Sequence, residues 1–580
     1  MRMISYAMKT TTAAASERCR QWLGHPRLDP GLRREIGAMA DDPAAIEEHF
    51  GGELVFGTGG MRGLIGPGTN RINCHTIGRV TQGLAHYLAA QPAFERSGRV
   101  RRVAIAYDTR RFSAEFAGQA ALVLAANGVK AFLFSDIRPT PVLSYAVREL
   151  GCDAGIVITA SHNPRDYNGY KVYGPDGGQV VSPLVDELIA AIAPLDFFDS
   201  VKIISRDEAV RAGLLELISA ELDRGYLEKV RGLSLTSPKA RLSVVYTPLH
   251  GTGSVHVAQL LSASGRVVTV VPGQADPDPE FSTVRVPNPE DPAALDMALE
   301  LAGRLEADIV LATDPDGDRV GTAVQAPDGS FQLLSGNQVG ALLIEYICSR
   351  LSAKDAMPPD PVVVTTIVTG HLGRRVAESY GVRTVETLTG FKFIGEKIGQ
   401  FEKEGTPAFV FGYEESCGYL TGTFVRDKDA VIASFLIAEM AAWYKERDIT
   451  LLDVLEDLHR RHGYHAEDLL SVELSDIAEA DRYVAAFDRL PATFAGSMIV
   501  EKRDYDRRIG WDYTPMRKFR LELPQSRVLH YSLADGSWFA VRPSGTEPKV
   551  KFYLGTCAAT PAAAAEQHAR LRAAILARQA

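Results

Sequence analysis

Ser161 lies in the segment Ala160-Ser-His-Asn-Pro164, which directly follows the apolar run at residues 155–159. Such a run predicts a buried parallel strand, and α/β proteins place their chemistry at the carboxyl ends of these strands. Asn and Pro favour a turn there, which would hold the Ser161 hydroxyl outward. A hydroxyl held in this way can act as a nucleophile or carry a phosphate. A lone Ser in a turn is more often structural, so other motifs must decide.

Three carboxylates follow another apolar run, at residues 308–312. Residues 313–319 read Thr-Asp-Pro-Asp-Gly-Asp-Arg, so Asp314, Asp316 and Asp318 alternate along a short loop. Carboxylates spaced in this way can converge on one hard cation, and oxygen ligands suit Mg²⁺. An EF-hand calcium loop is excluded, because the required Gly is not at its sixth position and its twelfth is Gln325. The motif predicts a magnesium site.

Two further motifs could bind a polar, phosphorylated ligand. Glu414 and Ser416 are two residues apart and would point the same way from an extended chain, toward neighbouring hydroxyl groups of a sugar. A solvated acidic loop is the alternative for this pair. Near the C-terminus, hydroxyl groups, exposed backbone N–H groups and cations together form a pattern typical of anion binding. The residues of this second motif are Arg542, Ser544, Gly545, Thr546 and Lys549.

The elements that must position these motifs alternate between short apolar runs and amphipathic segments such as residues 113–127. This alternation predicts an α/β fold of parallel sheets with crossover helices. The clearest apolar runs are residues 103–107, 131–134, 155–159, 242–246, 267–271, 308–312, 362–365 and 408–411. The pattern restarts near residues 240 and 360, and from about residue 465 it changes to shorter elements, followed by a helix within residues 558–580. We therefore expect three similar mixed α/β domains (1–225, 226–335, 336–462) and a C-terminal α+β domain (463–580).

Composition restricts the class of protein. A chain of 580 residues is too long for one core and suggests roughly three to five domains. The net charge of −9 disfavours a nucleic-acid partner. The six Cys include no CxxC pair, which favours reduced thiols over disulfides or zinc. No signal peptide and no run of apolar residues long enough for a membrane span is apparent. We expect a cytoplasmic protein, monomeric or homodimeric, without nucleic-acid or membrane partners.

In this order the four motifs resemble those of the α-D-phosphohexomutase superfamily, over about residues 50–555. Supporting matches lie at residues 56–63, 107–110, 138–141, 246–253 and 388–395. We call the motif of Glu414 and Ser416 the sugar motif. The match at 388–395 and the sugar motif look most like the long phosphoglucomutase branch, which also contains phosphopentomutases and glucose-1,6-bisphosphate synthases. The resemblance implies four domains around a central cleft, with the last domain closing over a phosphosugar substrate.

The resemblance also implies roles for individual residues. Ser161 would carry the phosphoryl group and, with the three Asp residues, complete the coordination of Mg²⁺. Glu414 and Ser416 would bind sugar oxygens O3 and O4, and the C-terminal motif would hold the non-reacting phosphate. Lys171 is the candidate for proton transfer, with a pKa lowered by burial beside a cation. His162 is interpreted chiefly as a positioning residue. The residues expected to supply further positive charge are Arg62, Arg319 and Lys392.

The sugar motif departs from that of the simpler bacterial members, which read Glu-x-Ser-Gly-His. Here Cys417, Gly418 and Tyr419 follow Ser416, so the role of that His cannot be transferred. His250, on a Gly-rich loop, fits either a residue that lines the cleft or a turn cap.

The implied activity is the interconversion of glucose 1-phosphate and glucose 6-phosphate through a phosphoserine enzyme, with glucose 1,6-bisphosphate as intermediate and activator. Mannose phosphates are possible further substrates. The alternatives are a phosphopentomutase, a glucose-1,6-bisphosphate synthase and a non-catalytic sugar-phosphate-binding protein. A serine hydrolase is disfavoured, because Ser161 does not lie in a Gly-x-Ser-x-Gly motif.

Overall fold

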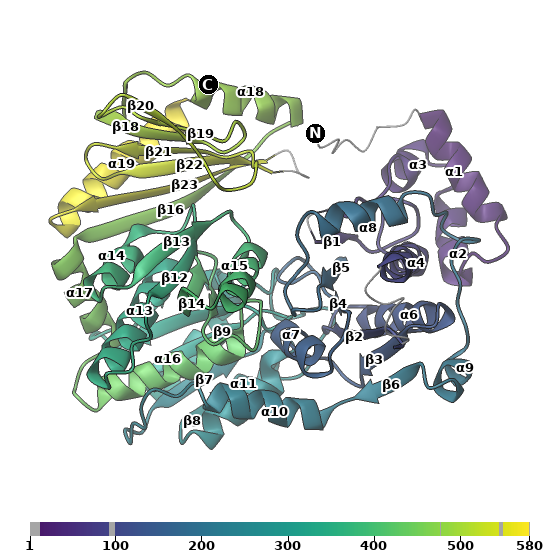
Figure 1. Cartoon of the computed structure of the whole chain (residues 1–580), viewed down its shortest axis with the longest axis horizontal. Coiled ribbons are helices and arrows are strands. Elements are labelled where there is room, and N and C mark those ends of the chain that lie inside the picture. Colours follow the sequence, from purple (N-terminus) through teal and green to yellow (C-terminus); the bar gives the residue numbers. More distant parts are fainter. Residues whose placement is uncertain (1–11, 58, 92–98, 476, 545–548, 579–580) are drawn as a thin grey trace. The chain divides into compact units, whose positions relative to one another are not determined.

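The computed structural model describes residues 12–57, 59–91, 99–475, 477–544 and 549–578 (Figure 1). Contacts divide the chain into two units. Unit 1 comprises Met1–Ser335, Phe391–Phe409 and Ser416–Glu446, and unit 2 comprises Gly336–Gly390, Val410–Glu415 and Arg447–Ala580.

The first sheet of unit 1 has the strand order β1-β5-β4-β2-β3-β6. Strands β4, β2, β3 and β6 run parallel, whereas β5 is antiparallel to both β4 and β1. The elements around this sheet are β1 (Gly60–Leu64), α4 (Cys74–Ala90), β2 (Arg102–Tyr107), α6 (Ser113–Ala126), β3 (Lys130–Phe134), α7 (Thr140–Glu149), β4 (Ala154–Ile158), β5 (Tyr167–Tyr173), α8 (Leu184–Ile192), α9 (Arg206–Arg211), β6 (Leu215–Ile218) and α10 (Ala220–Arg231).

The parallel strands of this sheet are buried, which explains their continuous apolar sequences. Ile105 and Ile156 share one core with residues of α4, α6 and α8. Three helices precede this sheet and form a core of their own around Trp22, Phe50 and Phe198. They are α1 (Thr12–Gly24), α2 (Pro30–Met39) and α3 (Pro43–Phe50).

The second sheet of unit 1 has the order β11-β10-β9-β7-β8. Strand β7 is parallel to β8 and β9, and β9 turns back antiparallel into β10. Its elements, with those of the later segments of unit 1, are β7 (Ser243–Thr247), α11 (Gly253–Ala263), β8 (Val267–Val270), α12 (Asp296–Leu305), β9 (Ile309–Thr313), β10 (Val320–Gln325), β11 (Phe331–Leu334), α15 (Phe391–Glu404), β15 (Gly418–Leu420) and α16 (Ala430–Lys445), with short 3₁₀ turns at Pro272–Gln274 and Pro292–Leu295.

Unit 2 contains a parallel strand pair, β12 and β13, and an antiparallel sheet of order β16-β23-β22-β21-β18-β19-β20, with β17 paired to β18. Its elements are α13 (Gly336–Ala353), β12 (Pro361–Thr366), α14 (His371–Ser379), β13 (Arg383–Thr387), β14 (Ala408–Glu414), α17 (Leu451–His462), β16 (Tyr464–Glu473), α18 (Ile477–Asp488), β17 (Thr493–Phe494), β18 (Ser497–Asp504), β19 (Ile509–Asp512), β20 (Arg517–Arg520), β21 (Leu529–Leu533), β22 (Trp538–Pro543), β23 (Lys549–Ala558) and α19 (Pro561–Ala577).

The fold class expected from the sequence is confirmed: mixed α/β sheets are followed by an antiparallel α+β region. Beside the parallel strands that the alternation predicted, β5 and β10 fold back antiparallel to β4 and β9, which makes these sheets mixed. None of the six Cys, all of which lie in the described part of the chain, forms a disulfide. In the described part of the chain no helix is both long enough and apolar enough to cross a membrane.

Glu467 of β16 should make the stability of unit 2 depend on pH. Burial raises its pKa to about 7, although a hydrogen bond from Asn337 Nδ2 (2.5 Å) opposes this shift. The folded state therefore holds the Glu467 proton over a pH range in which the unfolded chain, with a pKa of about 4.3, has lost it. The contribution of Glu467 to the free energy of unfolding is full below about pH 4 and is lost as the pH rises through 7, by at most about 4 kcal/mol.

We expect Glu467→Gln to remove this contribution, so that the difference in melting temperature between variant and wild type grows between pH 5 and pH 8. Thermal unfolding across this range measures it. The control is Glu522→Gln, which changes an exposed side chain of the same unit. A difference that stays constant with pH would contradict the assignment.

Candidate active site

Ser161 lies at the carboxyl end of β4, on a turn with left-handed backbone (φ = 51°). Its backbone N–H donates to Thr159 Oγ1 (2.8 Å), and the N–H of Asn163 closes the turn onto the carbonyl of Ala160 (3.1 Å). The Ser161 hydroxyl donates to Asp314 Oδ2 at 2.8 Å. Residues 153 positions apart thus meet at the ends of two neighbouring sheets of unit 1. The structure brings the first and second sequence motifs together.

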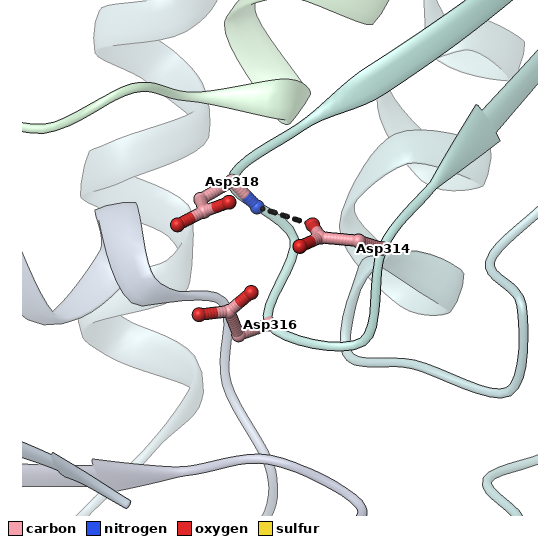
Figure 2. Close-up of side chains that lie close together, drawn as sticks. All are labelled: Asp314, Asp316 and Asp318. Carbon is pink, nitrogen blue, oxygen red and sulfur yellow. Dashed lines mark hydrogen bonds between the residues drawn. The ribbon is translucent and has the colours of Figure 1, made fainter. Parts of the chain in front are cut away.

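Asp314, Asp316 and Asp318 lie on the tight loop that connects β9 to β10. Figure 2 shows the three side chains turned toward one another, and each offers an oxygen within 4.8 Å of the other two. Asp314 Oδ1 accepts the N–H groups of Asp318 (3.1 Å, dashed in Figure 2) and Arg319 (3.0 Å), so the loop closes onto its first carboxylate. All three side chains are fully buried.

The electrostatics of this triad fit a bound cation. Burial, together with the carboxylates of Asp318 and Asp316, raises the pKa of Asp314 well above its usual range. Burial also raises the pKa of Asp316, but the ammonium groups of Lys171 and Lys428 outweigh it, so that this pKa is lowered. Oδ1 of Asp316 and Oδ1 of Asp318 are buried without a hydrogen-bond partner. Buried carboxylate oxygens without a partner are costly, and a divalent cation would satisfy them.

Two lysines neutralise part of the negative charge. Lys171 Nζ, on β5, lies 2.8 Å from Asp316 Oδ2 and 3.6 Å from Asp318 Oδ2, and Lys428 Nζ lies 2.7 Å from Asp318 Oδ2. Burial lowers the pKa of Lys171, but Asp316 and Asp318 outweigh burial and raise it. The lowered pKa expected from the sequence was wrong in this setting, because two carboxylates lie closer to Lys171 than the spacing of the motifs reveals.

Other predicted residues of unit 1 surround the same centre. Arg62, on β1, donates to Asn163 Oδ1 (2.9 Å), and His162 Nδ1 is 3.2 Å from the Ser161 hydroxyl. Burial and the cations Arg319 and Arg62 hold the pKa of His162 well below its usual range, so the imidazole is neutral near pH 7. A neutral ring beside the hydroxyl can position it by hydrogen bonding.

Arg319 joins the metal loop to the sugar motif. Its Nη1 donates to Glu290 Oε1 (2.7 Å) and to the carbonyl of Ser416 (3.2 Å). Lys392 lies in the first turn of α15, with Nζ 5.2 Å from the ring centroid of Phe393. His250 lies near Thr283 Oγ1 (Nε2, 2.8 Å) and the carbonyl of Asp276 (Nδ1, 3.2 Å), which favours the turn-fixing interpretation.

Unit 2 carries Glu414 and Arg542, whereas Ser416 belongs to unit 1. Glu414, at the end of β14, accepts the N–H of Gly390 (2.7 Å). Arg542, on β22, donates to the hydroxyl of Tyr553 (3.4 Å). Burial and the carboxylates of Glu415 and Glu414 together raise the pKa of Tyr553 to about 12, although Arg542 opposes them. Tyr553 is therefore close enough to interact electrostatically with Glu414 of the sugar motif and with Arg542 of the C-terminal phosphate-binding motif, which we call the anion motif.

The anion motif is described only in part. The N–H of Ser544 donates to the carbonyl of Lys549 (2.7 Å), and Lys549 Nζ is 3.3 Å from Glu473 Oε1. Gly545 and Thr546 lie outside the described residues. The described residues of the motif on either side lie at the ends of the paired strands β22 and β23.

Sequence reasoning did not find three residues of these sites: Lys428, Tyr553 and Thr140. Thr140 donates through its backbone N–H to the carbonyl of Asp316 (2.8 Å) and through its hydroxyl to Asp316 Oδ2 (3.1 Å). It lies in the supporting match at residues 138–141, which is a signal that could have found it. Lys428 and Tyr553 stand outside the motifs considered, and only their long-range contacts identify them.

Comparison with known proteins gives matches over nearly the whole chain. Family profiles described as phosphoglucomutase/phosphomannomutase match residues 53–198 (alpha/beta/alpha domain I), 224–329 (domain II), 335–461 (domain III) and 472–574 (C-terminal domain). A curated phosphoglucomutase of Staphylococcus haemolyticus is 38% identical over 520 residues, covering 88% of this chain and 91% of that protein. A phosphoglucomutase of Staphylococcus aureus (strain USA300) is 36% identical over 515 residues, covering 87% and 90%.

Solved structures share the fold. A phosphoglucomutase/phosphomannomutase family protein from Burkholderia thailandensis matches with a TM-score of 0.65 at 20% identity, over 90% of this chain and 97% of that one. The open form of pp63/parafusin from Paramecium matches with a TM-score of 0.67 at 16% identity, over 91% and 96%.

Proposed function

Because this chain belongs to the phosphoglucomutase/phosphomannomutase family, we propose that it is a phosphoglucomutase that works through a phosphorylated Ser161. It interconverts glucose 1-phosphate and glucose 6-phosphate, with glucose 1,6-bisphosphate as intermediate. The observation that carries the proposal is the hydrogen bond between the Ser161 hydroxyl and Asp314, inside a buried carboxylate triad that two lysines flank. A purely structural Ser would need neither the triad nor the lysines.

Asp314, Asp316 and Asp318 would hold Mg²⁺, which fits their unpartnered oxygens. When bound, this ion supplies neutralisation of the charge on the transferring phosphoryl group. Lys171 and Lys428 hold the triad carboxylates in place and keep the local charge low enough for a phosphate to enter.

In the transfer step, a sugar hydroxyl oxygen attacks the phosphorus of phosphoserine and the bond from phosphorus to Ser161 Oγ breaks. The hydroxyl proton leaves the sugar, and Ser161 Oγ regains a proton. Lys171 is our candidate for this proton transfer: its ammonium group, which Asp316 and Asp318 keep protonated, would give a proton to Ser161 Oγ and regain one from the sugar hydroxyl. The bisphosphate intermediate then turns over and returns its other phosphate to Ser161.

We propose that binding of the rest of the substrate falls to the other motifs. Glu414 and Ser416 would hold O3 and O4, which both substrate orientations present. The hydrogen bond from Gly390 to Glu414 fixes one oxygen of that carboxylate and supports this role. The non-reacting phosphate would meet Arg542, Ser544, Gly545, Thr546 and Lys549, while Arg62, Arg319 and Lys392 add positive charge.

A coupled spectrophotometric assay tests the proposal. Glucose 1-phosphate, mannose 1-phosphate and ribose 1-phosphate are compared in the presence of Mg²⁺ and a trace of glucose 1,6-bisphosphate. We expect glucose 1-phosphate to turn over fastest. A preference for ribose 1-phosphate would instead identify a phosphopentomutase, and bisphosphate synthesis from another donor without mutase turnover would identify a synthase.

The anion motif gives a separate prediction. We expect Arg542→Ala to raise KM for glucose 1-phosphate by roughly 10- to 100-fold, because a charged hydrogen bond to the distal phosphate is lost. Release of inorganic phosphate per turnover should also increase, since water reaches an incompletely covered phosphoserine. Initial rates and a phosphate assay measure both effects.

The matched control is Arg517→Ala, which removes an exposed arginine from β20 of the same unit. It should leave KM unchanged. An unchanged KM in Arg542→Ala would remove Arg542 from the proposed phosphate site.

A further inference from the structure

Arg110 has a buried guanidinium group that contacts the backbone of the Ser161 turn. Its Nη1 donates to the carbonyls of Pro164 (2.8 Å) and Tyr167 (3.0 Å), and its Nη2 donates to the carbonyls of Ser161 and Asn163. One side chain thus satisfies four carbonyl groups within a segment of seven residues, 161–167. The four Nη hydrogens of a guanidinium match these four acceptors.

Asp108 fixes the orientation of Arg110. Its Oδ2 is 3.3 Å from Arg110 Nε, and its Oδ1 accepts the Ser113 hydroxyl (2.7 Å) and the N–H of Arg110 (2.9 Å). The guanidinium also lies over the ring of Phe281, 5.1 Å from its centroid. Both charged side chains are buried, so the pair holds a fixed place between the end of β2 and the start of α6.

The turn needs such a support. Its carbonyl groups converge on one point, where they would repel one another and remain unsatisfied without a donor. Ser161 also holds a left-handed backbone (φ = 51°), which costs a non-glycine residue on the order of 1 kcal/mol. Both costs act against the conformation in which the hydroxyl meets Asp314. Lysine could not replace arginine here, because an ammonium group has three donors and no planar fork.

We propose that Arg110 is a positioning residue: by binding four carbonyls of the turn, its guanidinium holds Ser161 in the orientation from which the phosphoryl group is transferred. The inference rests on the proposed function, because it assigns a role relative to Ser161. Both Nη groups of Arg110 bind these carbonyls, so the proposal assigns Arg110 no contact with the substrate. Its loss should therefore change the rate of the transfer step and leave substrate binding intact.

The experiment compares kcat and KM of Arg110→Lys with those of the wild type. We expect kcat to fall about 100-fold, since displacement of a reacting group by about 1 Å costs this much, and KM to stay within about threefold. Hydrogen exchange at the amides of residues 161–167 should become faster in the variant. If Arg110 only stabilised the fold, its replacement would lower the melting temperature but would not lower kcat selectively while KM stays nearly constant.

The matched control is Arg71→Lys. Arg71 is also buried and pairs with the Glu48 carboxylate, but the backbone carbonyls to which it donates, those of Glu48 and Asn70, lie outside the Ser161 turn. It should lose stability and keep its kcat. If Arg110→Lys does not fold, the double variant Asp108→Asn/Arg110→Gln removes the buried charges together and takes its place. A folded variant with wild-type kcat would overturn the proposal for Arg110, whereas an inactive wild type would overturn the proposed function itself.

Discussion

Ser161→Ala is expected to lower kcat for the interconversion of glucose phosphates by at least about four orders of magnitude, ~5 kcal/mol in activation free energy. The methyl group cannot carry a phosphoryl group, and the hydroxyl that donates to Asp314 is lost. Coupled assays at saturating glucose 1,6-bisphosphate measure the loss. Melting temperature should change little, because one partly strained turn residue is shortened by one atom.

The control for this variant is Ser144→Ala on α7. Ser144 is equally buried, and its hydroxyl donates to the carbonyl of Gly177 (2.6 Å) and accepts the N–H of Arg426 (2.9 Å), so its loss tests the effect of removing any buried serine hydroxyl. It should reduce stability and leave kcat near that of the wild type. Substantial mutase turnover by Ser161→Ala would mean that the phosphoryl group travels by another route.

Asp316→Asn is expected to lower kcat by about three orders of magnitude or more, ~4 kcal/mol, if the bound metal is lost. The substitution keeps the shape of the side chain and removes one of three converging charges. It also deprives Lys171 of its nearest carboxylate (2.8 Å), leaving Asp318 Oδ2 at 3.6 Å. In a titration of activity with Mg²⁺, the concentration that gives half-maximal activity should rise. Calorimetry should show weaker Mg²⁺ binding.

Asp223→Asn serves as the control for this second prediction. Asp223 is a partly buried carboxylate of unit 1 that pairs with Arg138 (3.0 Å) and His256 (3.1 Å), outside the triad. Its loss should affect folding and not the Mg²⁺ titration. A near-normal rate and unchanged Mg²⁺ binding in Asp316→Asn would contradict the assignment of the triad as the metal site.

The sequence predicted the centre of the site because its chemistry is concentrated in short motifs. Ser161 and the Asp314 loop each follow an apolar run, and the rule that α/β folds place chemistry at strand ends singled out each of them. Their meeting was implied by the family resemblance, and the hydrogen bond between Ser161 and Asp314 brings them together. Lys428 gave no such signal. It is one charged residue among the neighbours Arg426, Asp427 and Asp429, and only folding brings it to Asp318.

The wrong expectation for the pKa of Lys171 comes from long-range contacts that the sequence does not reveal. The pKa of Lys171 depends on distances to Asp316 and Asp318 that come from another sheet, and these reverse the effect of burial. The antiparallel strand β5, which carries Lys171, has polar residues and Tyr at positions where a buried parallel strand would be apolar. Arg110 lies in the supporting match at residues 107–110, but the sequence did not predict its role. Its four acceptors are backbone carbonyl groups, which every residue type has.

The most direct test of the central claim is the phosphoryl content of Ser161 before and after substrate. Wild-type enzyme is loaded with glucose 1,6-bisphosphate, freed of ligand and measured by intact and peptide mass spectrometry, then mixed with one equivalent of glucose 6-phosphate. We predict one phosphoryl group on the peptide that contains Ser161, and its discharge into bisphosphate within the time of one turnover. A phosphoryl group on another residue, or one on Ser161 that does not transfer, would contradict the account.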